Sequence, residues 1–300
     1  MTVTIGIPAH NEEANIANLL NNLLVQTGSS FTLEKIIVFC DGCTDKTADI
    51  VSEFTLRDNR VFLVNDGRRL GKLNRLTQLF TQNTSQLVFI FDADVLPADS
   101  HVLEQMAQPF IQPRVGLVGG NSRPVRSATL FGQLLNAWSE AWYQVRAVFK
   151  NGNNVYNSRG CALAIRSGLA KKIRFPEGIY SDSQYIYFCI LSLGKDFIWA
   201  KKTVVWYRKP DNLKDYLIQI QRSTPDKMKI IHIFGNQVTA EYNIPRKAKI
   251  TGLIKTFLNH PLTTVLGALL NLFLVRLEGR QKYSLANSAW ITSPSTKKAI

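Results

Sequence analysis

Two aspartates stand two residues apart in Asp92-Ala93-Asp94, directly after an apolar run. Residues 86–91 are predicted to form a buried strand, so both carboxylates leave the sheet together in a turn. Carboxylate oxygens in such a turn are hard ligands that suit Mg²⁺ or Mn²⁺, and these ions usually also bind substrate phosphates. The pair alone does not separate a metal site from an ordinary turn, because aspartates commonly cap turns.

A second acidic segment, D-G-C-T-D at 41–45, follows the apolar run 35–40. Gly42 is typical of a turn and Thr44 of a helix N-cap, and these local roles leave Asp41 unexplained at the end of the predicted strand. A carboxylate in that place can accept hydrogen bonds from the N–H groups of a nucleobase.

Two further polar segments fit the same pattern. The predicted strand 3–8 runs into P-A-H-N-E-E, in which Asn11 followed by acidic residues also suits a helix N-cap. Gly71-Lys72-Leu73-Asn74 opens a predicted helix after the basic pair Arg68-Arg69, and a helix N-terminus beside a lysine favours phosphate.

The elements that must position these residues alternate along the chain. Strands are predicted at 3–8, 35–40, 61–65, 86–91 and 115–118, and helices at 12–25, 44–54, 71–81 and 99–110. This alternation predicts an α/β fold whose mostly parallel sheet is covered by helices on both faces. Right-handed crossovers then bring the strand ends, and the polar segments after them, to one edge where such sheets bind ligands.

The character of the chain changes after residue 120. The later predicted elements are a long helix at 128–149, a strand at 155–165, a helix at 185–193, two short strands within 197–206 and a basic helical region at 211–234.

Taken in order, I-P-A-H-N-E-E-A-N-I, V-F-C-D-G-C-T-D-K-T-A-D-I-V, G-K-L-N-R-L and F-D-A-D-V resemble the inverting family 2 glycosyltransferases. These enzymes have the GT-A nucleotide-diphospho-sugar transferase fold, which is Rossmann-like, and the resemblance covers roughly residues 2–225. Where the family usually has D-G-S-T-D, this chain has D-G-C-T-D. The resemblance implies nucleotide or diphosphate contacts, and the residues in question are Pro8, Glu12, Asp41, Lys72 and Asp92. It also implies a divalent cation, Mg²⁺ or Mn²⁺, on Asp94 and Asp92, with Asp94 as the direct ligand.

Two later segments extend the resemblance. N-S-R-G-C-A-L-A-I-R-S-G at 157–168 is similar to the segment that shapes the acceptor side of the family's site. F-P-E-G-I-Y-S-D is similar to the stretch that usually reads E-D before a helix, here Ser181-Asp182, which implies that Asp182 is the general base. A helix N-cap carboxylate is the alternative for Asp182.

A final segment, Q-I-Q-R-S at 219–223, resembles the Q-x-x-R-W signature of membrane-bound processive members. It implies that Arg222 neutralises the departing diphosphate; a basic, exposed helix face is the alternative. Serine in place of the tryptophan weakens the prediction of a processive polymerase.

The implied function is metal-dependent, inverting transfer of a hexosyl group from a nucleotide-diphosphate sugar to an acceptor hydroxyl. A non-catalytic nucleotide-sugar-binding protein and a nucleotidyltransferase of related fold are the alternatives. A nucleotidyltransferase is expected to have a Gly-rich, Arg-containing loop after the first strand, where this chain has P-A-H-N. A nucleic-acid partner is not expected, because no basic face with interleaved aromatic residues accompanies a known docking element.

Charge is distributed unevenly over the 300 residues. Residues 1–200 hold 19 basic and 17 acidic side chains, net +2, whereas residues 201–300 hold 17 and 5, net +12. Such an asymmetry predicts that the last third faces phosphates, an anionic membrane surface or both. Four cysteines and the absence of a recognisable signal peptide predict a cytoplasmic setting.

Residues 256–275 carry no formal charge and lie between basic flanks. Thr264, Gly267 and Asn271 form a thin polar stripe at helical spacing in this segment. The segment is predicted to lie in a membrane interface, to cross the membrane once, or to pack in a soluble core. We therefore expect a catalytic domain at 1–243, with halves 1–120 and 121–243, and a basic, apolar helical extension at 244–300. The expected location is the cytoplasmic face of a membrane, with a soluble cytoplasmic protein as the alternative and a lipid-linked or membrane-proximal acceptor.

Overall fold

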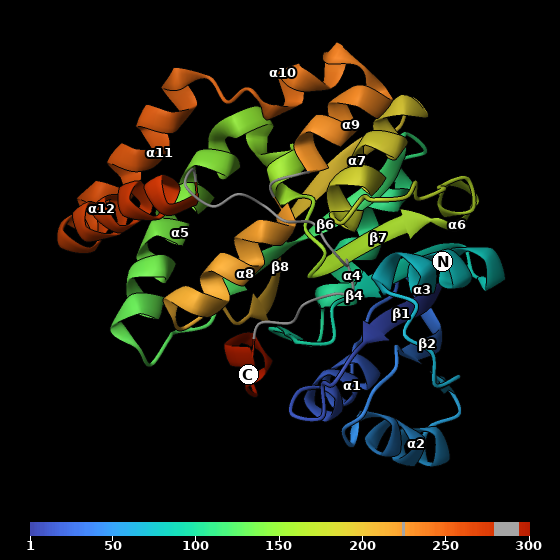
Figure 1. Cartoon of the computed structure of the whole chain (residues 1–300). Coiled ribbons are helices and arrows are strands. Elements are labelled where there is room, and N and C mark those ends of the chain that lie inside the picture. Colours follow the sequence, from blue (N-terminus) through green and yellow to red (C-terminus); the bar gives the residue numbers. More distant parts are fainter. Residues whose placement is uncertain (224–225, 279–293) are drawn as a thin grey trace. The chain divides into compact units, whose positions relative to one another are not determined.

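The computed structural model describes residues 1–223, 226–278 and 294–300 (Figure 1). The described residues form two compact units. The first contains 1–123, 158–207 and 297–300, and the second contains the described parts of 124–157 and 208–296. The predicted boundaries at 120 and 243 stay predictions.

The first unit is built on a mixed sheet in which eight described strands follow the order β3-β2-β1-β4-β7-β6-β8-β5. The strands are β1 (Thr2–Ala9), β2 (Thr32–Cys40), β3 (Val61–Val64), β4 (Leu87–Phe91), β5 (Val95–Pro97), β6 (Val115–Pro124), β7 (Ala162–Arg166) and β8 (Asp196–Tyr207). Neighbours among β3, β2, β1 and β4 are parallel, whereas β7 is antiparallel to β4 and β6, and β5 is antiparallel to β8. The predicted α/β class, with helices flanking a central sheet, is confirmed.

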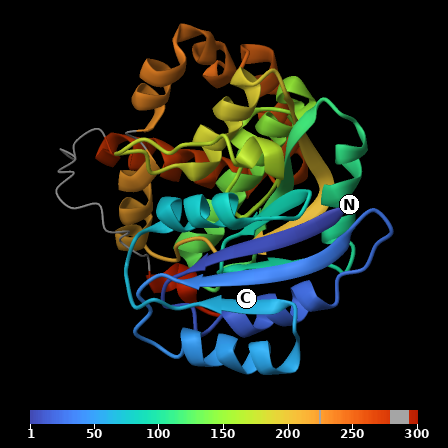
Figure 2. The same cartoon turned by 90° about the vertical axis from the view of Figure 1, so that its right-hand side faces the viewer.

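Helices cover both faces of the parallel strands. The helices of this unit are α1 (Ile16–Leu24), α2 (Thr47–Arg57), α3 (Lys72–Gln82), α4 (Val102–Ala107), α6 (Ser167–Ala170), α7 (Asp182–Ser192) and the 3₁₀ turn η1 (Gln108–Ile111). α3 lies on one face of β1 and β2, and α1 and α2 lie on the other (Figures 1 and 2). A Cβ on Gly6 of β1 would lie 2.1 Å from Leu79 Cδ2, so glycine is what lets α3 approach the sheet so closely.

The second unit is helical. Its elements are α5 (Leu130–Val148), η2 (Phe149–Gly152), η3 (Val155–Asn157), α8 (Leu213–Ser223), α9 (Asp226–Phe234), η4 (Asn236–Val238), α10 (Thr239–Tyr242), α11 (Arg246–Asn259) and α12 (Pro261–Glu278), followed by η5 (Pro294–Lys297), which ends in the first unit. The long helix α5 is its centre, because α11 and α12 both pack along it (Figure 1). Thr129 starts α5 as an N-cap, with its side chain accepting a hydrogen bond from the Gly132 N–H.

Three differences from the predicted elements are the clearest. Residues 256–275 are not one helix: α11 ends before His260, and α12 begins at Pro261, because proline has no N–H to donate and disfavours helical backbone in the residue before it. Residues 197–206 belong to one long strand, β8, rather than two short ones. The predicted strand 155–165 begins as a 3₁₀ turn and becomes strand at Ala162.

The described residues contain no helix that combines the length and the apolar character needed to cross a membrane.

Candidate active site

Three parallel strands end at one edge of the sheet. Ala9 at the end of β1 pairs with Cys40 at the end of β2, and β4 runs parallel on the other side of β1. The loops after these strands hold the predicted residues Glu12, Asp41 and Asp92. The sheet therefore brings three predicted segments to the edge where α/β sheets bind ligands.

Asp41 ties the β2 end to the loop before α3. Its Oδ1 accepts hydrogen bonds from the Leu70 N–H at 2.8 Å and from Arg75 Nε at 2.9 Å, and its Oδ2 accepts from the Gly71 N–H at 2.9 Å. Each carboxylate oxygen accepts about two hydrogen bonds, so Oδ2 keeps capacity for one more. Asp41 is thus first an organiser of the loop, and a nucleobase contact through Oδ2 stays a prediction.

Arg75 is a site residue that no sequence motif predicted. It is fully buried, and its guanidinium reaches Asp66 through Nη1 at 3.0 Å and Nη2 at 2.8 Å, besides Asp41. Gln78 Oε1 and the Arg68 carbonyl accept its two remaining N–H groups. The hydrogen bonds from Arg75, with the Arg68 N–H, hold the pKa of Asp66 well below its usual range. The motif G-K-L-N-R-L already contained Arg75 three residues after Lys72, and residues three apart on a helix share a face.

Lys72 brings together two predicted residues from distant parts of the chain. Its Nζ lies 2.5 Å from Asp92 Oδ1 and 2.8 Å from Asp182 Oδ2, and its side chain is 9% exposed. Burial by itself would lower the pKa of Lys72, but the two carboxylates outweigh burial and raise it, so the ammonium is charged. A Cβ on Gly160 would lie 3.0 Å from this Nζ, so glycine is what leaves room for the ammonium on that side.

Asp182 is the first residue of α7 and is buried. The N-cap position belongs to Ser181, which makes no side-chain capping bond. The carboxylate of Asp182 instead faces Lys72, and the Ser158 hydroxyl donates to the Ser183 carbonyl beside it. An N-cap role therefore does not explain this carboxylate.

Asp92 and Asp94 follow β4 as predicted. Burial, then the nearby negative charges of Asp92 and Glu12, raises the pKa of Asp94 to about 7. Negative charges that disfavour the ionisation of Asp94 in this way also attract a cation. The described residues contain no cluster of three or more His, Cys, Asp or Glu side chains suited to a metal. A divalent ion fits the hard oxygens of Asp92 and Asp94 provided that phosphate and water complete its shell.

Glu12 is buried and forms an ion pair with Lys297, a residue 285 positions later in the sequence. Lys297 Nζ lies 2.5 Å from Glu12 Oε1, and donates to the carbonyl oxygens of His10 at 2.5 Å and Asn11 at 2.9 Å. The Asn15 side chain donates to the Lys297 carbonyl at 3.0 Å. Burial raises the pKa of Glu12, and Lys297 partly offsets that rise. No sequence pattern links positions 285 residues apart, so Lys297 was missed.

His10 contacts both Asp41 and Arg69. Its Nε2 lies 2.6 Å from Arg69 Nη1, and its Nδ1 lies 2.8 Å from the Asp41 carbonyl oxygen. The guanidinium must donate, so Nε2 accepts and Nδ1 carries the proton toward the carbonyl. Burial lowers the pKa of His10, which favours this neutral form. Pro8 is buried within β1, paired with Phe39, and its predicted nucleotide contact stays a prediction.

Cys40 and Cys43 are free thiols beside this loop. The hydrogen bond between them moves their pKa values in opposite directions. It is the largest cause that raises the pKa of Cys40 and the largest cause that lowers the pKa of Cys43 to about 7. Cys40 is buried at the end of β2, and Cys43 is partly exposed.

Arg222 belongs to α8 in the second unit, and its side chain lies outside the described residues. Its predicted role at the leaving group therefore stays a prediction. The other predicted site residues all belong to the first unit.

Known proteins resemble this chain in sequence. The family model described as Glycosyl transferase family 2 matches residues 4–172. The Probable glycosyltransferase YdaM of Bacillus subtilis is 24% identical over 230 residues, which cover 71% of this chain and 52% of YdaM. The Poly-beta-1,6-N-acetyl-D-glucosamine synthase of Staphylococcus aureus is 28% identical over 134 residues, covering 44% of this chain and 31% of the synthase. The chain thus spans about half or less of the length of these relatives.

Solved structures resemble its fold. A mannosyltransferase from Pyrobaculum calidifontis, in complex with GDP-Man and Mn²⁺, superposes with a TM-score of 0.61 at 20% identity, covering 96% of this chain and 76% of that one. S. aureus TarS 1–349 in complex with UDP-GlcNAc superposes with a TM-score of 0.51 at 17% identity, covering 86% and 81%. Since the family model matches more than half of the chain, the chain belongs to glycosyl transferase family 2.

Proposed function

We propose that this chain transfers a sugar from a nucleotide-diphosphate sugar to an acceptor hydroxyl with inversion at the anomeric carbon. The observation that carries the proposal is the Asp92–Lys72–Asp182 contact, in which one buried ammonium joins a carboxylate of the predicted diphosphate site to the predicted base. Family membership and the nucleotide-bound structural neighbours support the donor class.

The proposed reaction is a single displacement. The acceptor oxygen forms a bond to the anomeric carbon as its proton passes to the Asp182 carboxylate. The bond between the anomeric carbon and the phosphate oxygen breaks, and its electron pair leaves with the nucleoside diphosphate. Because one carboxylate acts and no covalent sugar–enzyme intermediate forms, the configuration inverts.

The leaving group needs positive charge. A divalent cation held by Asp94 and Asp92 supplies charge neutralisation for the diphosphate when it is bound. The Mn²⁺-containing structural neighbours support such a cation in this family. The chain's own contribution is the Lys72 ammonium, with Arg222 as a further proposed donor to the departing phosphate.

The acceptor is proposed to be lipid-linked or membrane-proximal, with the protein peripheral at the cytoplasmic face. Of the net +12 on residues 201–300, +8 lies in 244–300, where nine basic side chains accompany one acidic side chain. Such a basic segment favours an anionic surface over a neutral one.

The test is a screen of nucleotide sugars that measures nucleoside diphosphate release and product stereochemistry, with and without Mn²⁺. Asp94→Ala is expected to abolish metal-dependent release, whereas Asp99→Ala, at an exposed aspartate five residues away, leaves it unchanged. Asp182→Asn is expected to bind nucleoside diphosphate but lose transfer, with Asp196→Asn as its surface control. Wild-type activity in Asp182→Asn contradicts the assigned base, and nucleotide-sugar binding without turnover in the wild type indicates a sensor.

A further inference from the structure

The outer side of α11 and α12 exposes a row of large apolar side chains, here termed the apolar face. Their exposed fractions run from 37% at Leu253 to 75% at Leu258. The face consists of Ile250, Leu253, Ile254, Phe257, Leu258, Leu262, Val265, Leu266, Leu269, Leu272 and Phe273. Soluble monomers rarely expose contiguous apolar surface of this kind without a partner.

The inner side of α11 is made of small residues. Ala248, Gly252 and Thr256 recur every four residues and are buried. A Cβ on Gly252 would lie 2.6 Å from the backbone nitrogen of Val145 in α5, so the two helix backbones approach closely.

α12 repeats this arrangement against α5. Thr264 and Gly267 are buried, and a Cβ on Gly267 would lie 3.1 Å from the Trp138 backbone nitrogen. The polar stripe predicted from the sequence therefore faces protein instead of water at these two positions. Helices of soluble proteins bury large apolar residues and expose polar ones, whereas packing through small residues with large apolar residues outside is typical of a lipid environment.

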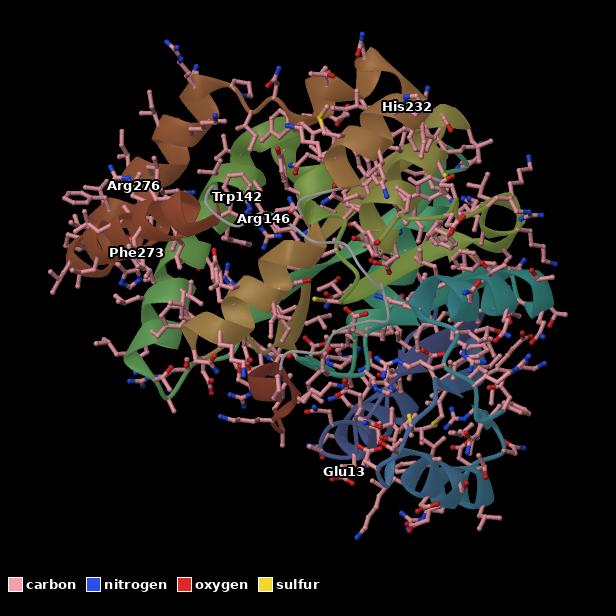
Figure 3. All side chains as sticks on the ribbon, in the orientation of Figure 1. Glu13, Trp142, Arg146, His232, Phe273 and Arg276 are labelled. Atoms are coloured by element: carbon pink, nitrogen blue, oxygen red, sulfur yellow. The ribbon has the colours of Figure 1, made fainter. Side chains whose placement is uncertain are left out.

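The charges on α11 and α12 are mostly basic. Residues 246–278 hold five basic residues and one acidic residue, Glu278 at the end of α12. All five basic residues are exposed, and they are Arg246, Lys247, Lys249, Lys255 and Arg276. Figure 3 shows Phe273 and Arg276 on α12, and Trp142 and Arg146 on α5.

We propose that α11 and α12 dock the second unit on an anionic lipid bilayer, with the apolar face at the boundary between headgroups and acyl chains and the basic residues at the headgroup phosphates. A second copy of the chain is disfavoured as the occupant, because an isologous contact would bring the same basic residues together. The docking does not depend on the chemistry of the first unit, and its link to the proposed function is that it would hold the protein where a lipid-linked acceptor lies.

The experiment is flotation of the full chain with vesicles of phosphatidylcholine, alone or mixed with phosphatidylglycerol. The wild type is expected to float with the anionic vesicles and much less with the neutral ones. Leu262→Asp with Leu269→Asp is expected to lower binding at least about tenfold. The matched control, Leu56→Asp with Ile111→Asp, changes side chains that are 89% and 73% exposed elsewhere and should bind like the wild type.

A second variant tests the charge separately from the apolar contact. Lys247→Glu with Lys255→Glu is expected to remove the preference for anionic vesicles without disturbing any buried residue. The proposal is overturned if the wild type stays unbound at low salt, or if the apolar variant binds like its control. It is also overturned if the apolar variant turns a wild-type dimer into a monomer, which identifies a second copy as the occupant.

Failure of docking and failure of the proposed chemistry are distinguishable. Hydrolysis of the nucleotide sugar by water, measured without vesicles, reports the proposed chemistry with no contribution from docking. The Leu262→Asp, Leu269→Asp variant should keep that hydrolysis while losing flotation, whereas Asp94→Ala should lose hydrolysis while keeping flotation.

Discussion

Replacing Arg75 by methionine should lower the stability of the protein far more than the same replacement of an exposed arginine. Methionine keeps most of the side-chain volume but removes all five N–H donors of a fully buried guanidinium. Asp41, 5% exposed, then loses its cation and keeps the backbone N–H groups of Leu70 and Gly71. Asp66, 26% exposed, recovers part of its solvation from water.

The magnitude follows from these burial differences. Removing one partner of a buried ion pair costs about 3–5 kcal/mol, because the remaining charge is left uncompensated. Asp41 keeps two hydrogen bonds and Asp66 reaches water, so the lower end, about 3 kcal/mol, is expected for Arg75→Met. With a denaturant slope of about 3 kcal/mol/M, the urea midpoint falls by about 1 M.

The assay is urea unfolding followed by circular dichroism, with Arg68→Met as the control. Arg68 contacts the same Asp66 at 3.0 Å, but its side chain is 66% exposed, so its loss should cost no more than about 1 kcal/mol. Adding Asp41→Asn to Arg75→Met should recover part of the loss, since the stranded charge is removed. Equal midpoints for Arg75→Met and Arg68→Met would refute the reasoning that burial makes this arginine structural.

Three other outcomes can be checked on the first unit. Lys297→Ala frees the acceptors of the β1–α1 loop, which are the carbonyl oxygens of His10 and Asn11 and the carboxylate of Glu12. Calorimetry should then show that nucleoside diphosphate binds severalfold more tightly, whereas the control Lys298→Ala should leave the affinity unchanged. Weaker binding would make Lys297 part of the donor site. Cys43 has a pKa of about 7, so its alkylation by iodoacetamide should rise as pH increases through 7 and the thiolate forms, a rise that mass spectrometry should not find in Cys43→Ser. Gly160→Ala places a Cβ 3.0 Å from Lys72 Nζ and should lower turnover about tenfold, with an unchanged melting temperature. Wild-type turnover in this variant would mean that the space between Gly160 and Lys72 Nζ is not used in the reaction.

The first half of the fold was predictable because local rules decide it. Uninterrupted apolar runs that end in D-G-C-T-D and D-A-D predicted β2 and β4 and the carboxylates at their ends, and the structure places both strands as expected. Caps were less predictable. Thr44 was expected to cap α2, but the helix begins at Thr47 and the Thr44 N–H donates to the Asn11 side chain instead. A contact between two loops outweighed the local preference.

The helical extension after residue 243 likewise combines features that the sequence predicts with features that only tertiary contacts decide. Its charge and apolar content could be read along the chain, but the side of each helix that faces protein could not. Gly252 and Gly267 lie against the backbone of α5, and that choice of neighbour turns the large apolar residues outward.

By itself, the sequence determined the residue types of the site, the strand ends that carry them and the family. Tertiary structure alone decided which charges meet: Lys72 with Asp182 from α7, Arg75 with Asp41, and Lys297 with Glu12. The physical reason is that a motif records neighbours along the chain, whereas the pairing of a buried charge depends on which groups the folded backbone leaves within about 3 Å of it.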